Sequence, residues 1–487
     1  MRKSMIVFFI GHILRIEGLL LALPLICALI YGENVIPFVV PMVFLIVFGT
    51  AISLRPPQMR EFTPRDSLIT VGLCWILLSL FGAAPMFLCG YGISFADCFF
   101  ETVSGFTTTG ATILGVSVRI SALPKGILFW RSFTHWIGGM GVLVFMLAVL
   151  PGSDMRSTKL MHLMRAEIPG PMVDKIVSKI KHTARILYGI YLGLTVIEIV
   201  MLLFGGMPLY DSLLNAFGTA GTGGFTPTDN SIEAYDSSYL QWVVGVFMLL
   251  FGVNFNVYYL ILTGQVLRAF KSEELRCYLG IVGVSTLIIG WNIYSMYSSV
   301  SEVARHSFFQ GASIITTSGF ATTNFNLWPN LSKAIIVLLM FCGACTGSTG
   351  GGIKIGRLMM LVKNGIREMR YSTNPHEVIS VRFEGKRVSH ETLRGTTSFM
   401  IIYTIIFIVS FLLITLIENA DFVTGFTGVA TCINNVGPGL GDIIGPAGSF
   451  GSLSELSKVI LSFDMLAGRL EIYPILMLFS PRVWRMR

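Results

Sequence analysis

The stretch that decides the fold is Cys98-Phe-Phe-Glu-Thr-Val-Ser-Gly-Phe-Thr-Thr-Thr-Gly110, because it recurs as Ser307-Phe-Phe-Gln-Gly-Ala-Ser-Ile-Ile-Thr-Thr-Ser-Gly319. Six of the thirteen positions are identical in the two copies, including the final glycine. Two more distant copies, 211–225 and 421–438, also run from an apolar segment into polar residues and glycine. Each copy predicts a short helix that ends in an irregular strand. The chain is therefore built from four related units.

Each copy lies between two apolar segments. A helix needs about 20 apolar residues to cross the hydrocarbon core of a bilayer. The paired segments are 67–89 and 126–150, 186–205 and 239–267, 277–298 and 333–360, and 396–417 and 456–480. Two further segments, 5–30 and 36–54, precede them. We therefore predict ten crossings in an all-α, polytopic membrane protein.

These segments predict a linear organisation in seven parts. The parts are two N-terminal transmembrane helices (1–62), pore repeat 1 (63–152), a cytoplasmic basic linker (153–185), pore repeat 2 (186–272), pore repeat 3 with a glycine-rich intramembrane loop (273–362), a second cytoplasmic basic linker (363–395) and pore repeat 4 (396–487). Both linkers are expected to be too small to bury a core.

Composition and charge agree with a membrane protein. Of 487 residues, 53% are apolar and 13% are charged, whereas soluble proteins carry about 25% charged residues. The net charge of +8 comes from basic clusters between the apolar segments, such as seven Lys and Arg from 156 to 185 and nine from 354 to 394. Cytoplasmic loops accumulate Lys and Arg. The basic residues therefore predict cytoplasmic termini, and a nucleic-acid partner is not expected.

The four middle segments are too short and too polar to cross the membrane. Irregular backbone at membrane depth is tolerated only where it is buried in protein or lines a water-filled cavity. Four re-entrant loops around one axis would aim their carbonyl oxygens at a common pore, as in the filters that select monovalent cations. Thr and Ser hydroxyls would add oxygens or tie the strands to their surroundings. The filter stretches contain no carboxylate, which hard divalent cations favour.

Three of the segments open on Asp97, Asp211 and Asp421, where a carboxylate suits a helix N-terminus. The third segment opens on Arg305-His306 and is expected to break this pattern. Arg131 and His135 are four residues apart on one helix face, and we assign them a structural role beside the filter.

The four filter sequences resemble those of the Trk/Ktr/HKT potassium-transporter superfamily. Two extra N-terminal spans and the run Ala467-Gly-Arg-Leu-Glu-Ile-Tyr-Pro474 are similar to its TrkH/TrkG branch. The resemblance implies four repeats around one pseudo-fourfold pore, a homodimer in the cell inner membrane, and a cytoplasmic TrkA-like nucleotide-binding subunit. It carries the filter glycines over to Gly110, Gly223, Gly319 and Gly437. Some relatives have Ser at the first glycine, which is associated with sodium transport, so Gly110 implies potassium.

The cation-binding residues expected from this resemblance are Thr108, Thr109, Gly110, Thr222, Gly223, Thr317, Ser318, Gly319, Asn435, Val436 and Gly437. No cofactor is expected, apart from the potassium ion in the pore.

The second span of the third unit carries six glycines between 343 and 356, too many for a continuous helix. It predicts a broken helix below the filter and resembles the intramembrane gating loop of the family. The expected gate residues are Gly343, Gly347, Gly350, Gly351, Gly352 and Lys354.

Arg469 lies in the middle of a span, where a charge is a functional hypothesis. Either it pairs with Glu471 or a pore-helix end and holds the bundle together, or it projects beneath the filter as a barrier to cations, as its family counterpart does.

Three functional classes remain open. The first is gated, channel-like potassium uptake. The second is a secondary transporter coupled to protons or sodium (symport), for which intramembrane Glu198, Glu418, Asp464 and Glu471 are the candidate coupling carboxylates. An enzyme is disfavoured, because no nucleophile, paired-carboxylate or metal motif lies at membrane depth.

Overall fold

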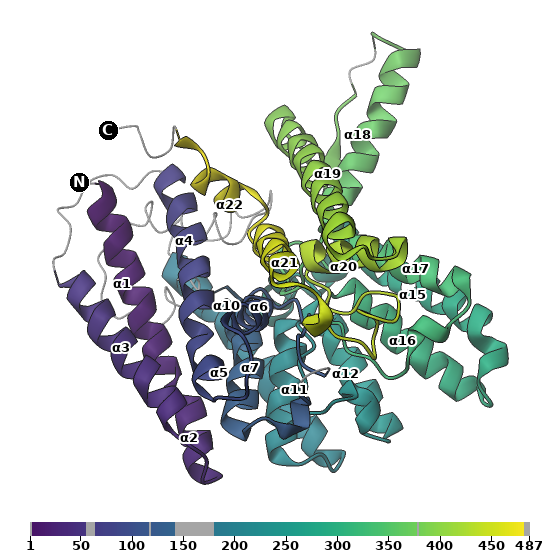
Figure 1. Cartoon of the computed structure of the whole chain (residues 1–487). Helices are drawn as coiled ribbons and strands as arrows, with labels where there is room; N and C mark the ends of the chain where they lie inside the picture. The colour runs from purple at the N-terminus through teal and green to yellow at the C-terminus, as the bar shows by residue number, and fades with distance from the viewer. Residues whose placement is uncertain (1, 55–63, 116–117, 142–179, 377–378, 482–487) are drawn as a thin grey trace.

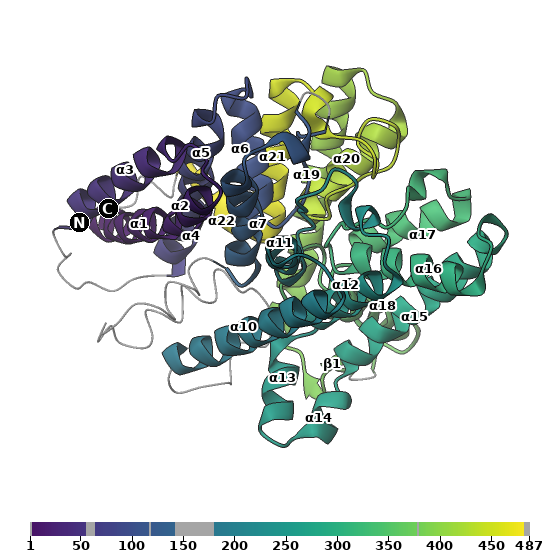
Figure 2. The ribbon, with the colours of Figure 1, turned by 90° about the horizontal axis from the view of Figure 1, so that it is seen from below.

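The structure is a computed structural model that describes residues 2–54, 64–115, 118–141, 180–376 and 379–481. It is a helical protein in which the four repeats surround a centre and the N-terminal helices pack outside repeat 1 (Figures 1 and 2). The start of α1, the end of α22 and the projecting α18 lie on the same side of the molecule (Figure 1). Most of the linker predicted for 153–185 lies outside the described residues.

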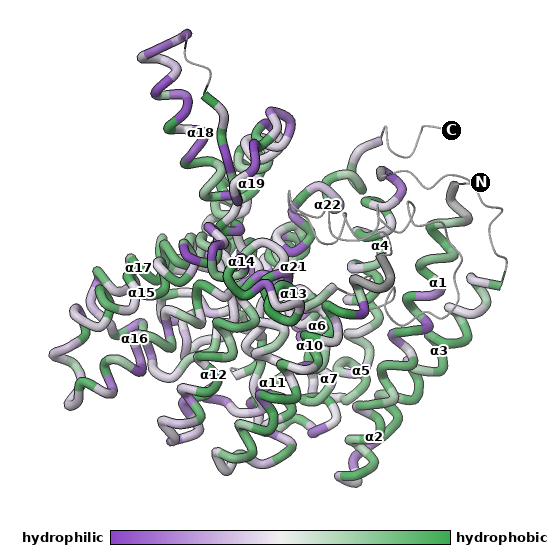
Figure 3. Tube along the Cα trace, turned by 180° about the vertical axis from the view of Figure 1, so that it is seen from behind, coloured by the Kyte–Doolittle hydropathy of each residue, from purple (hydrophilic) through white to green (hydrophobic). Residues whose placement is uncertain are grey.

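Six long apolar segments form helices of membrane-spanning length within the described ranges. They are α1 (Arg2–Leu20) with α2 (Ala22–Ile30), α3 (Ile36–Ser53), α4 (Pro64–Gly82) with α5 (Ala84–Leu88), α10 (Ile180–Phe204), α15 (Glu273–Ile293) and α19 (His390–Glu418). They correspond to the two predicted N-terminal spans and the first span of each repeat. Apolar residues dominate these helices (Figure 3).

Four shorter helices follow the first spans at the places of the repeated motif. They are α6 (Phe95–Phe106), α11 (Leu209–Gly221), α16 (Val300–Ile315) and α20 (Phe422–Asn434). The expectation for the third was wrong: α16 begins five residues before Arg305, with the Ser299 hydroxyl as its N-cap and Glu302 in its first turn. Like α6, α11 and α20, it therefore carries an acidic side chain at its start, where a negative charge complements the free N–H groups of the helix.

The second span is interrupted in repeats 2, 3 and 4, and in repeat 1 its described helix ends at Gly139, whereas the sequence predicted a break only in repeat 3. The helices are α7 (Lys125–Gly139); α12 (Ser238–Phe251) and α13 (Phe255–Leu262), bent by 90°; α17 (Asn330–Phe341) and α18 (Ile355–Thr373); and α21 (Glu455–Arg469) and α22 (Tyr473–Leu478). The continuation of α7 to residue 150 lies outside the described residues. The end of α7 and each of the three interruptions lie at or beside a glycine. In the order of the repeats these are Gly138, Gly252, Gly343 and Gly468, and each is in close contact with the end of one of the short helices or with the glycine-rich loop.

The linker after α18 is more ordered than expected. It forms a two-stranded antiparallel hairpin of β1 (Arg382–Phe383) and β2 (Lys386–Arg387). Val381 and Phe383 pack with Met360 of α18 and Leu393 of α19 in a small buried cluster. The linker therefore buries its own apolar side chains against α18, contrary to the prediction.

The remaining short elements connect these helices. They are α14 (Val266–Phe270) and the 3₁₀ turns Ile120–Ala122, Ser231–Ala234, Tyr294–Met296, Phe325–Leu327 and Phe450–Ser452. The largest apolar core joins the N-terminal helices to repeats 1 and 4, and two further cores lie largely in repeats 2 and 3. The polar strands after the four short helices lie where these cores meet.

Candidate cation pathway

The four short helices α6, α11, α16 and α20, which we call the pore helices, end in the same backbone motif. One residue takes the left-handed conformation, with φ between 54° and 59°, at Thr108, Thr222, Thr317 and Asn435. The next N–H donates to the carbonyl five residues earlier, from Thr109 to Ser104 (2.9 Å), Gly223 to Gly218 (2.8 Å), Ser318 to Ser313 (2.8 Å) and Val436 to Thr431 (2.9 Å). This is the hydrogen bond of a Schellman-type helix end. The four strands after the helices are thus equivalent position by position.

A glycine with positive φ stands two residues after each left-handed residue. These glycines are Gly110 (φ 80°), Gly224 (φ 80°), Gly319 (φ 74°) and Gly437 (φ 103°). The family resemblance assigned Gly223 in repeat 2, which is one residue out of register with the glycines of the other three repeats. Two adjacent glycines made the choice ambiguous, and only the hydrogen-bonding pattern resolves it. Gly223 is the structural equivalent of Thr109, Ser318 and Val436.

These glycines close a ring around the centre of the four repeats. A Cβ built on each glycine would overlap or crowd a carbonyl oxygen of the next repeat: Gly110 against Gly223 O, Gly224 against Ser318 O, Gly319 against Val436 O and Gly437 against Thr109 O. Each strand therefore approaches its neighbour more closely than a side chain would permit. Each repeat therefore contributes one backbone carbonyl to the ring. The four are those of Thr109, Gly223, Ser318 and Val436.

The hydroxyls beside the ring hold the strands in place. Thr109 and Thr107 share a hydrogen bond of 2.8 Å between their hydroxyls, and Ser318 and Thr316 share one of 2.9 Å. Asn435 Nδ2 donates to Thr109 Oγ1 at 2.9 Å, which joins repeat 4 to repeat 1. These contacts favour the second of the two roles that the sequence left open for the hydroxyls, which is to tie the strands to their surroundings.

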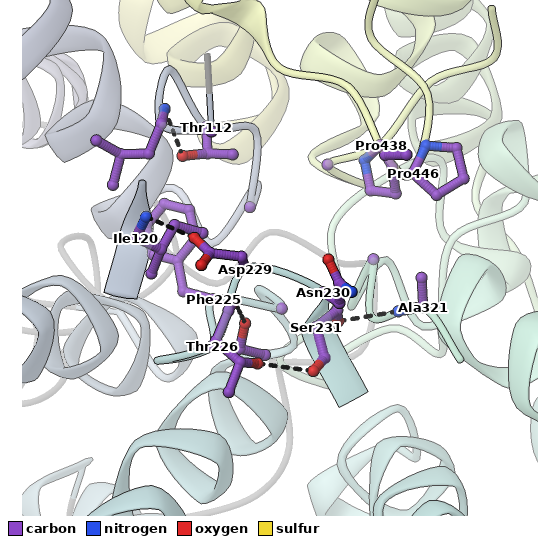
Figure 4. A pocket seen from close by; sticks show the side chains of 18 of the residues that line it. Thr112, Ile120, Phe225, Thr226, Asp229, Asn230, Ser231, Ala321, Pro438 and Pro446 are labelled. Carbon is purple, nitrogen blue, oxygen red and sulfur yellow. Dashed lines mark hydrogen bonds between the residues drawn. The ribbon is translucent and has the colours of Figure 1, made fainter. Parts of the chain in front are cut away.

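A cavity of about 660 Å³ lies on one side of the ring, and Gly110, Gly224, Gly319 and Gly437 line its floor. Figure 4 shows Asp229 at its wall, where its carboxylate accepts from the Ile120 N–H at 2.7 Å and the Ser121 hydroxyl at 2.6 Å. Burial would raise the pKa of Asp229, but these hydrogen bonds more than offset it and hold the pKa below its usual range. This link between repeats 1 and 2 therefore keeps its charge to lower pH than a free aspartate does.

A buried ion pair supports the filter strands of repeats 1 and 2. Glu101 on α6 accepts from Arg131 Nε at 2.6 Å, and both side chains are at most 3% exposed. Glu101 also accepts from the Ile113 N–H at 2.8 Å, while Arg131 donates to Thr226 O at 3.1 Å. Arg131 thus has the predicted structural role, beside the strands that follow the short helices of repeats 1 and 2. Glu101 was missed, although its alignment with the neutral Gln310 was a signal.

The glycine-rich loop between α17 and α18 folds back on itself next to the filter. The Gly343 N–H donates to Ile353 O at 2.9 Å and closes the base of the loop. At the tip, the Gly351 N–H donates to the hydroxyl of Thr317 at 2.7 Å. Lys354 Nζ donates to Gly350 O. The expected gate residues therefore form one compact loop that touches the left-handed residue of the third filter strand.

Arg469 connects this loop to the C-terminal end of α7 in repeat 1. Its guanidinium donates to Thr349 O at 2.7 Å, Gly138 O at 2.5 Å and Gly139 O at 2.8 Å. Glu471 accepts from Arg357, so the Arg469–Glu471 pair, one of the alternatives considered for Arg469, is not the one that forms. Arg469 of repeat 4 therefore connects repeats 1 and 3, and its positive charge lies next to the glycine-rich loop.

Glu274 is a second anchor of the loop, which sequence reasoning missed. Its side chain is buried near the start of α15, and Oε1 accepts from the Thr346 N–H at 2.7 Å and the Gly356 N–H at 2.9 Å. One carboxylate oxygen therefore connects the first part of the loop, at Thr346, to the start of α18, at Gly356. Its place in the first turn of a helix made it look like an ordinary helix-start acid.

The four candidate coupling carboxylates do not gather around one path. Glu198 is buried on α10, and Asp464 accepts from the Ser410 hydroxyl at 2.8 Å. Glu418 accepts from the Ser454 N–H at 2.9 Å, and Glu471 is paired with Arg357. None of the four is among the described residues that line the cavity above the ring. The same described ranges hold no cluster of three or more His, Cys, Asp or Glu that could bind a metal ion.

Comparison with known proteins gives concordant matches along the chain. Residues 37–486 match the family model TrkH, described as cation transport protein. The Trk system potassium uptake protein TrkH of Salmonella typhimurium is 35% identical, over 97% of this chain and 99% of that protein. TrkG of Escherichia coli, another Trk system potassium uptake protein, is 34% identical over 98% and 97%. The crystal structure of the potassium transporter TrkH from Vibrio parahaemolyticus superposes over 100% of both chains, with a TM-score of 0.88 at 31% identity.

Proposed function

The chain belongs to the TrkH family of cation transport proteins, and we propose that the ring of four carbonyls is the selectivity filter through which it takes up potassium. It is an integral membrane potassium uptake protein and not an enzyme. The observation that carries the filter proposal is the closed set of glycine-to-carbonyl contacts between consecutive repeats. The oxygens of Thr109, Gly223, Ser318 and Val436 would replace water around the ion.

Potassium suits this ring for two reasons. Carbonyl oxygens replace the hydration shell of a monovalent cation, whereas the ring offers no carboxylate for a hard divalent ion. The ring is also braced by backbone contacts and by hydroxyl hydrogen bonds such as Asn435 to Thr109. This bracing restrains the carbonyls, so we expect them to close less readily around the smaller sodium ion.

We assign the glycine-rich loop 343–354 the role of a gate beneath the filter. Its tip donates a hydrogen bond to Thr317, and Arg469 and Glu274 anchor it from repeats 4 and 3. A glycine-rich segment has few side-chain contacts of its own, so these anchors set its position. Release of the anchors would let it leave the ion path.

Arg469→Ala is expected to raise potassium flux by about an order of magnitude without loss of potassium-over-sodium selectivity, because a positive charge below the filter repels cations. Flux into liposomes containing purified protein measures the effect. Arg469→Lys keeps the charge but loses most of the three-carbonyl contact, so it separates the barrier from the tether. Unchanged flux in Arg469→Ala would contradict the barrier role.

Glu274→Ala is expected to raise basal flux and to lower the melting temperature, because two buried N–H groups lose their acceptor at about 1–3 kcal/mol each. Glu274→Gln is the matched control, since its amide oxygen still accepts. Basal flux in liposomes and thermal unfolding in detergent report the two effects. A Glu274→Ala protein that melts earlier but stays closed would show that the anchor does not control the loop.

We further propose that the protein is a homodimer of the cell inner membrane with both termini in the cytoplasm. Basic residues flanking the described helices and the common side of α1, α18 and α22 support this orientation (Figure 1). A cytoplasmic nucleotide-binding subunit of the TrkA type would regulate uptake. The projecting α18 and the β1–β2 hairpin present basic side chains on that side, which makes them its proposed docking surface.

Channel-like uptake is favoured over coupled transport, because the candidate coupling carboxylates do not line the cavity above the ring. The deciding experiment measures potassium flux in liposomes with and without a proton or sodium gradient. Uncoupled, selective flux down the potassium gradient is expected. Flux that strictly requires either gradient would establish the secondary transporter instead.

A further inference from the structure

The filter strand of repeat 2 lacks a side chain that the other three strands have. Behind the ring carbonyl, Thr109, Ser318 and Val436 carry buried side chains, and the equivalent residue of repeat 2 is Gly223. Thr109 and Ser318 use their hydroxyls to tie the strand to its helix end. Among the residues that the structure describes, none gives Gly223 a side-chain brace from its own strand, and Gly224, with positive φ, comes directly after it.

The imidazole of His135 fills this place from the neighbouring repeat. A Cβ built on Gly223 would overlap Nδ1, Cγ and Cε1 of the His135 ring. The ring also stacks on Phe225, with 4.0 Å between centroids and 18° between planes. Nδ1 accepts from the Phe225 N–H at 3.4 Å, and the residue is fully buried. His135 therefore contacts the strand on both sides of Gly224.

The helix that carries His135 is itself held firmly. Arg131, one turn earlier on α7, is paired with Glu101 and places its guanidinium carbon 3.5 Å from the centre of the Phe225 ring. The carbonyl of His135 lies against Gly221, whose added Cβ would overlap it. The imidazole is thus presented from a rigid support, as precise sites require.

We propose that His135 is a positioning residue of the selectivity filter, which supplies from repeat 1 the side chain that Gly223 lacks and so sets the Gly223 carbonyl in the ring. This inference rests on the proposed filter function. His135 does not touch the ion; it acts through Gly223 and Phe225. The filter of repeat 2 is therefore completed by another repeat.

The test is an exchange between the two positions. Gly223→Ala should abolish selective flux, because the methyl group and the imidazole compete for one space. His135→Ala should lower the potassium-to-sodium flux ratio by about tenfold, since the strand loses its brace. The double variants His135→Ala/Gly223→Ala and His135→Ala/Gly223→Thr should recover flux that Gly223→Ala loses, because the side chain returns to its own strand.

Flux of both ions in liposomes and thermal unfolding in detergent are measured for every variant. An unchanged flux ratio in a folded His135→Ala protein, or double variants no better than Gly223→Ala, would overturn the proposal. If His135→Ala alone does not fold, the comparison of the double variants with Gly223→Ala decides. The Gly224→Ala variant tests the ring separately: if it leaves selectivity intact, the filter assignment itself fails.

Discussion

Deletion of residues 347–352 is expected to raise basal potassium flux by about one to two orders of magnitude, because it removes the part of the glycine-rich loop that touches the filter. The deleted segment includes Gly351, whose N–H donates to Thr317, and Thr349, whose carbonyl accepts from Arg469. A cation must keep its water or exchange it for polar ligands along its path, and a loop packed beneath the proposed filter leaves little room for a hydrated ion. Its removal leaves the filter as the narrow part of the path.

The deletion should leave selectivity unchanged, because the four ring carbonyls come from other segments. Flux of potassium and of sodium in liposomes therefore gives two independent readings. Gly365→Ala is the control, since this glycine lies on α18 with open space around it. Basal flux equal to that of the control would remove the loop from gating, and a parallel loss of selectivity would mean that it shapes the filter.

Gly224→Ala is expected to abolish selective potassium uptake. Alanine in the left-handed conformation costs about 1–2 kcal/mol, and the methyl group would overlap the carbonyl oxygen of Ser318. The carbonyl must move, and the ring then loses its closed geometry. Potassium and sodium fluxes in liposomes should fall together or become unselective.

Gly206→Ala separates the ring contact from backbone strain. Gly206 lies in the same repeat with φ 83°, but nothing lies within 4 Å of an added Cβ. It carries a similar conformational penalty without a neighbour to displace, so near-normal selectivity is expected. Equal damage from both substitutions would indicate strain alone and would contradict the ring.

Much of the fold was predictable, because a bilayer imposes strict rules on sequence. The six long helices follow from apolar length, and the pore helices follow from the repeat that joins 98–110 to 307–319. The start of α16 was missed because the third segment was taken to open at Arg305-His306, whereas Ser299 and Glu302 lie six and three residues before Arg305. The N-cap serine and the first-turn glutamate of α16 were present in the sequence, but they lie before the repeated segment 307–319.

The breaks in the second spans were harder to predict. In repeat 3 the glycines are dense enough to exclude a helix. In repeat 2 the chain bends by 90° at Gly252-Val253-Asn254, a stretch with a single glycine. There the loop of repeat 3 supplies the missing partners, since the Phe255 N–H donates to Gly347 O and the Cys345 N–H to Gly252 O. The break depends on backbone groups far away in the chain.

The sequence by itself determined that this chain lies in a membrane, that it has four repeats, and that a glycine-containing polar strand ends each pore helix. Those properties depend on local composition and spacing, which a single chain displays directly. The tertiary structure alone decided that Gly224 rather than Gly223 closes the ring, that Glu274 and Arg469 hold the loop, and that His135 backs the strand of another repeat. Each of these is a contact between residues from different segments, and such contacts depend on how the four repeats pack around their common centre.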